Sequence, residues 1–560
     1  MEFTRSFESK DIDLPSFVPK GCEAGYNILM RELKKGKDTN ILVYYDPDID
    51  GLMSGLIAQS YLEQLGVKSR YCINNNRTHG FRLLTDEFLK SMKGGLIIAV
   101  DFSITKPEFD KILRAGVNII NIDHHEIDLD SFNTNLDYVY SKCGDAYGVI
   151  LNNQYLDEPD KFRFLSGAGM VYYFMKYVSN YTKKMLWSDY AAMTGISLLS
   201  DIRELESPEA FKFLNYAFSL HSHFLQYLIE MIKCESSVIP RFRSFGVPRI
   251  SREFIDFEFS PIFNAMLRAD LGDTCVKLLK GDEKTFVEMC RYGQIFTYRA
   301  RQKQIISAIA KKIDESKDLV GNYTRDYSSL SVASISSSFE PVEGYNITNY
   351  VGVACSQIKD DYMTGAVFVI DENTNKSIRG SVRGSMDGVD YLGIFRKNGV
   401  PCAGHHNAFG ILSCDISKID FEQINKDIEE AEMQFKNSNG DTRRVLEVNN
   451  LSIFVKNPQC KTISTLNEFS RDNHRIFIKY TGDKENIKVQ KMSDKYTKIY
   501  IDGVCIHSFD ASLNAEKDFI LFGYENGKYD KAVLRQRFDY DHSINAFELL
   551  DIYNKQILGK

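Results

Sequence analysis

The sequence has no apolar run that approaches the roughly twenty residues needed to span a bilayer. It also has no internal repeat, no low-complexity segment and no C-x-x-C pair, since its 11 cysteines are scattered singly. The first twenty residues are rich in charge, which argues against a secretory leader. These absences argue against a membrane protein and a cysteine-based zinc or redox site, and they favour a cytoplasmic protein with free thiols.

An excess of positive charge is also missing, because the formal net charge is -7. A nucleic-acid partner would therefore have to be bound by a local basic patch. The contents of 43% hydrophobic and 26% charged residues are those of a soluble globular protein. A chain of 560 residues is too long for one core and suggests roughly three or four domains.

The most informative stretch is ILVYYDPDIDGLMSG, at residues 41–55. Its first five residues predict a buried strand of a parallel sheet, and Gly51 allows the chain to turn into a helix. Asp46, Asp48 and Asp50 follow the strand at a spacing of two. Open α/β sheets bind ligands at the carboxyl ends of their strands, so these acids predict a metal site. Turn formation alone is the alternative, since Asp-Pro and Asp-Gly occur in many turns.

Two further apolar strands also end in aspartate. Residues 96–100 stop at Asp101, and residues 117–122 stop at Asp123, which is followed by His124 and His125. Helical patterns alternate with these strands, so we expect a doubly wound α/β domain with a parallel sheet. The strand ends of such a sheet share one edge, and the recurrence of aspartate there favours the metal site over turn chemistry.

Asp201 follows the apolar helical stretch AAMTGISLLS. A carboxylate on a buried helix is costly unless it is paired or binds a metal, although a helix end in water is the alternative. Carboxylates with one or two imidazoles favour two Mn²⁺ or Mg²⁺ ions over a structural Zn²⁺, and Asp101 is the candidate bridge between the ions. The predicted metal ligands are Asp46, Asp48, Asp50, Asp101, His124 and Asp201.

The second half of the chain contains other candidate binding segments. Residues 285–318 predict one long helix that carries basic side chains between residues 291 and 312, with aromatic residues interleaved. This composition suits single-stranded nucleic acid, while a solvated connecting helix is the alternative. Strands follow at residues 328–435, with segments rich in Gly, Arg and His. Short strand patterns at residues 445–540 predict a β-rich module, for which a small barrel is one candidate form.

These motifs carry a resemblance to the DHH phosphoesterase superfamily. DPDIDG, VDFS, DHH and LLSDIREL resemble its ordered motifs. CAGHHNAFG looks like the glycine motif of the DHH-associated domain, with SVRGS as its arginine segment. SGAGMVYYF and SPIFNAMLRADLGD resemble segments of RecJ-like exonucleases, so the resemblance covers about residues 40–415.

The resemblance implies an exonuclease that uses Mn²⁺ or Mg²⁺ to degrade single-stranded DNA from the 5′ end, in recombination and repair. It implies the six metal ligands named above. It also makes Asp101, Asp123, His124 and His125 the candidate catalytic residues. The candidate substrate-binding residues are Arg77, Asn264, Arg268, Arg379, Arg383, His405 and His406. Partners would be single-stranded DNA and single-strand-binding or recombination proteins.

The expected organisation has five parts. They are an N-terminal arm (1–38), a DHH catalytic domain (39–284), a connecting helix (285–318), an α/β DHH-associated domain (319–440) and a C-terminal β-rich module (441–560), loosely similar to the oligonucleotide-binding barrel of RecJ proteins. Two other functions stay open: a DHH phosphodiesterase of short oligonucleotides or cyclic dinucleotides, and a non-catalytic nucleic-acid-binding protein. The basic helix and the extra module favour a polymer as substrate.

Overall fold

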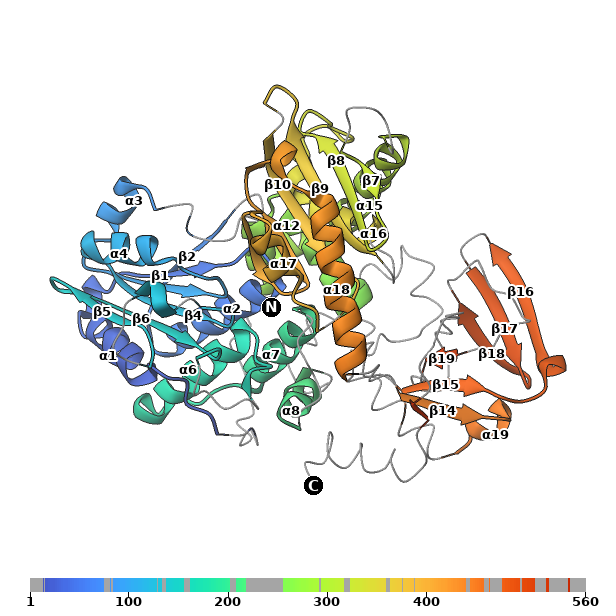
Figure 1. Ribbon diagram of the computed structural model, residues 1–560. Helices are drawn as coiled ribbons and strands as arrows, with labels where there is room; N and C mark the ends of the chain where they lie inside the picture. Colours follow the sequence, from blue (N-terminus) through green and yellow to red (C-terminus); the bar gives the residue numbers. More distant parts are fainter. Residues whose placement is uncertain are drawn as a thin grey trace. The chain divides into compact units, whose positions relative to one another are not determined.

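The computed structural model divides into two compact units (Figure 1). The first contains Met1–Arg203 and Phe213–Gln434, and the second contains Glu204–Lys212 and Phe435–Lys560. The structure describes residues 14, 16–74, 81, 84–127, 129–132, 137–155, 162–201, 208–217, 255–291, 294–316, 323–358, 363–374, 376–386, 388–439, 444–457, 463, 476–493, 496–508, 520–522 and 542–543.

The first unit contains a six-stranded sheet in the order β2-β1-β3-β4-β6-β5. Its strands are β1 (Ile41–Tyr45), β2 (Arg70–Ile73), β3 (Leu96–Val100), β4 (Asn118–Asp123), β5 (Tyr140–Cys143) and β6 (Ala146–Asn152). All neighbouring strands are parallel except β5, which pairs antiparallel with β6 at the edge. Every residue of β1, β3 and β4 is buried, as their apolar sequences predicted.

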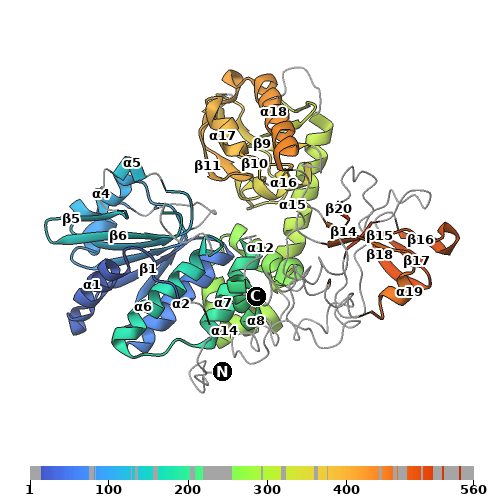
Figure 2. The same ribbon diagram turned by 60° about the horizontal axis from the view of Figure 1, so that its bottom comes forward.

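Helices cover both faces of this sheet, which confirms the doubly wound fold (Figure 2). Figure 2 shows α4 and α5 above the sheet and α1, α2 and α6 below it. The lower helices are α1 (Cys22–Leu33), α2 (Ile49–Gln64) and α6 (Gly167–Thr182), and α7 (Ser188–Ser200) packs on α2 and α6. The upper helices are α3 (Asp86–Ser91), α4 (Lys106–Arg114) and α5 (Leu129–Phe132). Both faces of the sheet are therefore core, and its functional groups are left to the strand ends.

A group of helices follows the first sheet along the chain. They are α8 (Pro208–Ala217), α12 (Ser260–Arg268), α13 (Gly272–Leu279), α14 (Glu283–Phe286) and α15 (Gln294–Ser316), with π-helical turns η3 (Ile255–Phe259) and η4 (Val287–Arg291). The expectation of one helix over residues 285–318 is thus only partly met, because a π-helical turn separates α14 from α15. Among the described residues, every helix is too short or too polar to cross a bilayer.

The long helix α15 belongs to the core of a second sheet. Ile305, Ile309 and Ile313 recur at a spacing of four, so they form one apolar stripe. This stripe packs in one cluster with residues of β8 and β9 and of helix α16. The basic residues Lys303 and Lys311 are exposed on other faces of α15.

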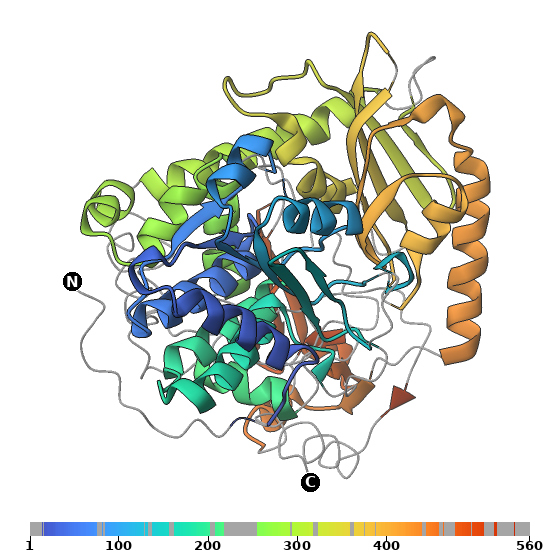
Figure 3. The same ribbon diagram turned by 90° about the vertical axis from the view of Figure 1, so that its left-hand side faces the viewer.

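The second sheet has seven strands, in the order β11-β12-β10-β9-β8-β7 with β13 beside β10. The strands are β7 (Arg325–Asp326), β8 (Leu330–Ser336), β9 (Thr364–Asp371), β10 (Lys376–Arg383), β11 (Cys402–His405), β12 (Ala408–Ile411) and β13 (Cys414–Asp415). Its helices are α16 (Val351–Ile358), α17 (Tyr391–Lys397) and α18 (Phe421–Asn439). Figure 3 shows the orange helix α18 beside the yellow strands, where Phe421 packs against Phe368 of β9. The second α/β fold is thus confirmed.

The described residues of the second unit form two sheets. The strands are β14 (Arg444–Val448), β15 (Ile476–Tyr480), β16 (Ile487–Ser493), β17 (Tyr496–Ile501), β18 (Val504–Ser508), β19 (Ile520–Phe522) and β20 (His542–Ser543), with the short helix α19 (Leu451–Phe454). One sheet has the order β19-β15-β14-β20 and the other is the antiparallel meander β16-β17-β18. The β-rich character expected from the sequence is present, while the barrel form stays a prediction.

Candidate metal centre

The three aspartates after β1 converge because the chain turns directly from the strand into α2. Asp46 follows the last strand residue, and Asp48 caps α2 by accepting a hydrogen bond from the Gly51 N–H at 2.9 Å. Asp50 lies in the first helical turn and is 2% exposed. A methyl group on Gly51 would lie 2.3 Å from the carbonyl oxygen of Asp46, so this turn requires glycine.

Asp50 is held by the start of helix α6. Its carboxylate accepts the Gly167 N–H at 2.7 Å and the Ala168 N–H at 2.8 Å. The Ser197 hydroxyl of α7 donates to Oδ1 at 2.5 Å, and Ser54 donates to the same oxygen at 3.3 Å. Burial and the charge of Asp48 raise the Asp50 pKa, and the donors from Ser197, Ala168 and Gly167 oppose this rise. Because Oδ1 already accepts three donors, Oδ2 is the oxygen best placed to bind a cation.

Asp101 is the most constrained carboxylate of the group. It follows β3 with φ at 67°, a left-handed conformation that residues with a side chain rarely adopt. Its N–H donates to the Ile122 carbonyl at 2.8 Å, and its side chain is 2% exposed. A methyl group on Gly167 would lie 2.5 Å from Asp101 Oδ1. The glycine at the start of α6 therefore leaves the space that the Asp101 carboxylate occupies.

The DHH segment follows β4 and supplies two imidazoles. His124 is 2% exposed, and its Nε2 lies 3.1 Å from Asp101 Oδ1 and 3.6 Å from Asp50 Oδ2 and from Asp201 Oδ2. Asp201 is the residue directly after α7, so this helix end faces the cluster.

His125 is paired with Asp123, the last residue of β4. The distance from its Nδ1 to Asp123 Oδ1 is 2.6 Å, and the Ser103 hydroxyl donates to the other Asp123 oxygen at 3.2 Å. Burial opposes ionisation of both groups, but their mutual attraction raises the His125 pKa to about 9 and lowers the Asp123 pKa. Asp123 thus orients the His125 ring.

The potential ligand atoms form three groups, each within 4.8 Å. The groups are Asp46 with Asp48 and Asp101, Asp50 with His124 and Asp201, and Asp101 with Asp123, His124 and His125. Every residue predicted to bind metal is therefore brought into one cluster. Asp101 and His124 each belong to two of the groups, and Asp101 Oδ1 lies 3.1 Å from His124 Nε2.

The composition of this cluster fits a hard divalent cation. Burial, followed by the charges of Asp50, Asp48, Asp46 and Asp201, raises the Asp101 pKa well above its ordinary value. Asp101 Oδ1 accepts no hydrogen bond within the described part of the chain, although it is fully buried. Several buried carboxylates can be ionised together only if a cation lies among them, and carboxylate oxygens with imidazole are ligands of Mn²⁺.

The predicted substrate-binding residues are only partly gathered at this centre. His405 of β11 reaches it, because its ring lies 5.0 Å from the His125 ring and 5.9 Å from the His124 ring, between centroids. His406 lies between two acids, with Nε2 at 2.6 Å from Glu126 and Nδ1 at 3.1 Å from Asp390.

The other predicted substrate-binding residues lie on different elements. Arg268 Nη1 donates to Gln302 Oε1 at 2.9 Å and so joins α12 to α15; Asn264 lies one turn earlier on α12. Arg379 and Arg383 lie on β10, where Arg383 donates to the Ser381 hydroxyl and the Val382 carbonyl, each at 2.8 Å. Arg77 lies outside the described residues.

Two supporting features of the cluster were not predicted from the sequence. Ser197 lies within an apolar helix, where its hydroxyl gave no signal of a partner 147 positions away. The small residues of SGAG resembled a family segment, but their close packing on Asp50 and Asp101 could not be derived from the sequence alone. The alternation of small residues at the start of a helix was the available signal.

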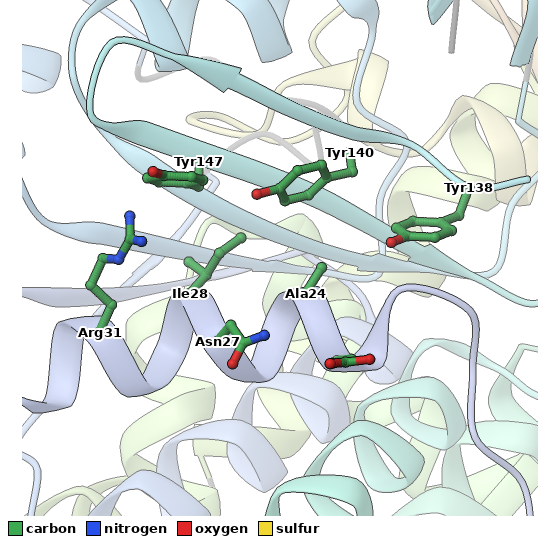
Figure 4. Close-up of a pocket in the computed structure, with 8 residues that line it drawn as sticks. Ala24, Asn27, Ile28, Arg31, Tyr138, Tyr140 and Tyr147 are labelled. Carbon is green, nitrogen blue, oxygen red and sulfur yellow. The ribbon is translucent and has the colours of Figure 1, made fainter. Parts of the chain in front are cut away.

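A pocket of about 220 Å³ lies elsewhere in this unit, between α1 and the β5–β6 hairpin (Figure 4). Figure 4 shows Tyr138, Tyr140 and Tyr147 opposite α1, and the Arg31 guanidinium lies 4.0 Å from the centre of the Tyr147 ring. None of the predicted site residues lines it.

One protein family and several solved structures are similar to this chain. Residues 40–196 match the model of the DHH family, N-terminal domain. A comparison with curated proteins found no match. Among solved structures, Thermus thermophilus RecJ in complex with Mn²⁺ is similar with a TM-score of 0.62 and 16% identity, over 96% of this chain and 74% of that one.

Two other RecJ structures are similar. One is T. thermophilus RecJ with Mg²⁺, at a TM-score of 0.58 and 14% identity, over 96% of this chain and 74% of that chain. The other is an exonuclease RecJ bound to manganese. Its TM-score is 0.52 and its sequence identity is 17%, over 74% of this chain and 95% of that chain. Residues 40–196 are therefore a DHH-family N-terminal domain, in a chain that has the fold of RecJ.

Proposed function

We propose that the protein is a metal-dependent phosphoesterase that hydrolyses phosphodiester bonds of single-stranded DNA, starting at the 5′ end. The observation that carries this proposal is the buried cluster at the strand ends, in which Asp101 is shared between groups of potential ligands. Mn²⁺ or Mg²⁺ is the proposed cofactor because the structurally similar RecJ proteins were solved with these ions.

The proposed ligand sets follow the grouping of the side chains. Asp46, Asp48 and Asp101 would hold one ion, and Asp50, His124 and Asp201 would hold a second. Asp101 would be shared between the two ions, because its Oδ1 lies 3.1 Å from His124 Nε2 of the second set. Bound ions of this kind activate water and neutralise charge on a phosphoryl group.

The other side chains of the site would orient the substrate. Asp123 fixes the Nδ1 side of His125, which leaves Nε2 as the nitrogen that can donate to a phosphate oxygen. The His405 ring, from β11, stacks on the His125 ring and places a third imidazole beside His124 and His125. We assign both histidines to phosphate binding, because neighbouring imidazoles supply hydrogen-bond donors and positive charge to a phosphate group.

A polymeric substrate is favoured by helix α15 and the second sheet. The helix carries Arg299, Arg301, Lys303, Lys311 and Lys312 among its described residues, and the Arg301 guanidinium donates to the Tyr345 hydroxyl at 2.9 Å. Basic and aromatic side chains in alternation contact phosphates and bases of a single strand. A dinucleotide would reach few of these groups.

The proposal is tested with single strands of several lengths, labelled at the 5′ or the 3′ end, with and without a chelator. We expect Mn²⁺-dependent release of the 5′ label as a mononucleotide before the strand shortens at its 3′ end. Equal rates on dinucleotides and long strands would instead favour a phosphodiesterase of short oligonucleotides. Activity that survives the chelator would contradict the metal mechanism.

A further inference from the structure

We infer that Tyr391 and Glu432 are positioning residues for Arg383 and His405, two of the predicted substrate-binding residues on the second sheet. This inference rests on the proposed function, because it assigns a role to groups that would hold the strand. The two side chains form a buried cluster under the turn that follows β10, directly after Arg383.

The Tyr391 hydroxyl is the centre of the cluster. It donates to Glu432 Oε1 at 2.7 Å, and it accepts the Met386 N–H at 3.0 Å. The Ser385 hydroxyl lies 2.9 Å from the Tyr391 hydroxyl and donates to the same Glu432 oxygen at 2.5 Å. One carboxylate oxygen on α18 thereby fixes two residues of the turn through two hydroxyl groups.

The burial of this cluster makes its hydrogen bonds important. Glu432 is 6% exposed although it lies on a helix with many exposed residues, and Tyr391 is fully buried. A buried carboxylate is costly unless its oxygens accept hydrogen bonds, so the turn is held where it can donate to Glu432. Burial followed by the charge of Glu432 raises the Tyr391 pKa, so the phenol stays a donor.

The same tyrosine connects the turn to the histidine segment. A methyl group on Gly384 would lie 2.3 Å from the Tyr391 ring, so the backbone of the turn packs directly on this ring. The Gly384 N–H donates to the Asn407 carbonyl at 2.7 Å, and the Leu392 N–H donates to the His406 carbonyl at 2.9 Å. Arg383 and His405 therefore directly precede two backbone segments that are hydrogen-bonded to each other and to the start of α17 beside Tyr391.

The chain offers a matched control on the same helix. Asn425 of α18 is 7% exposed and joins the helix to another loop, because its Nδ2 donates to the Ser328 hydroxyl and its Oδ1 accepts the Ser329 N–H, each at 2.9 Å. Asn425→Ala removes buried hydrogen bonds of α18 without touching the turn at residues 384–386. Asn425→Ala therefore shows how the loss of buried hydrogen bonds in this domain affects DNA binding when the turn is intact.

The experiment measures the Kd of a 5′-phosphorylated, fluorescent single strand and, separately, kcat and KM. Binding is measured in an Asp101→Asn background so that the strand is not degraded. We expect Tyr391→Phe and Glu432→Ala to raise Kd and KM about tenfold, with kcat changed less than about twofold. Glu432→Gln keeps an oxygen acceptor and should bind within about twofold of the reference protein, as should Asn425→Ala.

Unchanged Kd in Tyr391→Phe, or equal losses in Asn425→Ala, would overturn the positioning role. If Glu432→Ala does not fold, Tyr391→Phe alone decides, because it removes one hydroxyl and leaves the ring on Gly384. Failure of the proposed function has a different signature, since the reference protein itself would then neither bind nor degrade single strands. That result would overturn this inference as well.

Discussion

At the scale of single residues, Asp50 shows how hydrogen bonds orient a proposed metal ligand. Its Oδ1 accepts hydrogen bonds from two hydroxyls and one backbone N–H, while Oδ2 accepts one backbone N–H. The residues that orient a ligand commonly matter almost as much as the ligand itself. Ser197 is the donor most easily removed without disturbing the backbone.

Ser197→Ala should weaken Mn²⁺ binding by about tenfold, because Asp50 loses its shortest hydrogen bond and with it a fixed orientation. Titration calorimetry of the metal-free protein measures this directly. Ser200→Ala on the same helix is the control, since the Ser200 hydroxyl donates to the Ile196 carbonyl and does not contact Asp50. Equal affinities of the two variants would show that Ser197 does not position the ligand.

Gly167→Ala should weaken Mn²⁺ binding more than the small size of the added methyl group suggests. The added methyl group would lie 2.5 Å from Asp101 Oδ1 and 2.6 Å from its Cβ, so either α6 or Asp101 must shift. We expect Mn²⁺ affinity to fall by at least about tenfold, with nuclease activity falling alongside it. A variant that binds Mn²⁺ as tightly as the parent would mean that the Asp101 carboxylate is not held in its ligating position.

The sequence predicted the acids of this site but not their supports. Asp46, Asp101 and Asp123 were found because each ends an apolar strand, and parallel strands end at one edge. Ser197 and Gly167 act across long stretches of chain, on Asp50 and Asp101, and no local periodicity encodes such interactions. The left-handed conformation of Asp101 could not be predicted from the sequence either, because most aspartates do not adopt it.

At the scale of elements, helix α15 has one buried apolar face and one exposed basic face. Its isoleucine stripe lies in the core of the second sheet, and its exposed side chains include Lys303, Lys311 and Lys312. The sequence predicted the helix and its charge. It did not predict the π-helical turn at Val287–Arg291, because such turns are set by tertiary packing and have no sequence period of their own.

Replacing Lys303 and Lys312 with Glu should weaken binding of single-stranded DNA and reduce its dependence on salt. If both lysines bind phosphates, the slope of log K against log salt should become shallower by roughly 0.7 for each phosphate that is no longer neutralised. The measurement is a salt series of fluorescence anisotropy. Lys90→Glu with Lys93→Glu has the same change in net charge, and both of these lysines are exposed in and after α3. An equal effect of the two pairs would indicate a general charge effect and no binding of phosphate by α15.

At the scale of the whole molecule, a cation bound at the proposed centre would stabilise the folded protein. Buried carboxylates repel one another, as the raised pKa of Asp101 indicates, and a bound cation relieves this repulsion. An ion at 100 times its Kd stabilises the folded state by about 2.7 kcal/mol. Mn²⁺ should therefore raise the melting temperature of the metal-free protein by several degrees.

The neutral substitution Asp101→Asn should not destabilise the metal-free protein, but it should abolish most of the stabilisation by Mn²⁺. It replaces an acid that burial and neighbouring carboxylates disfavour with a neutral amide, so the metal-free variant should be at least as stable as the metal-free parent, while the stabilisation by Mn²⁺ should largely disappear. Calorimetric melting of both proteins with and without Mn²⁺ measures this. Asp110→Asn is the control, because Asp110 pairs with Lys106 and Arg114 on α4. A full Mn²⁺ effect in Asp101→Asn would contradict the role of Asp101.

The two α/β sheets of the first unit were predictable because their strands and helices alternate with clear periods. The second unit was predictable only as β-rich. Its short strands pair across long stretches of chain, and β14 lies parallel to both β15 and β20. Strand order of this kind depends on tertiary packing and is not specified by local turns.

The proposed metal centre holds two ions that share the Asp101 carboxylate. Anomalous diffraction from a crystal of the Mn²⁺-loaded protein tests this arrangement most directly. We expect two manganese peaks, about 3.5 to 4 Å apart, that both contact the Asp101 carboxylate, with Asp46 and Asp48 beside one and Asp50, His124 and Asp201 beside the other. A single peak, or two peaks of which neither is shared by Asp101, would contradict this arrangement.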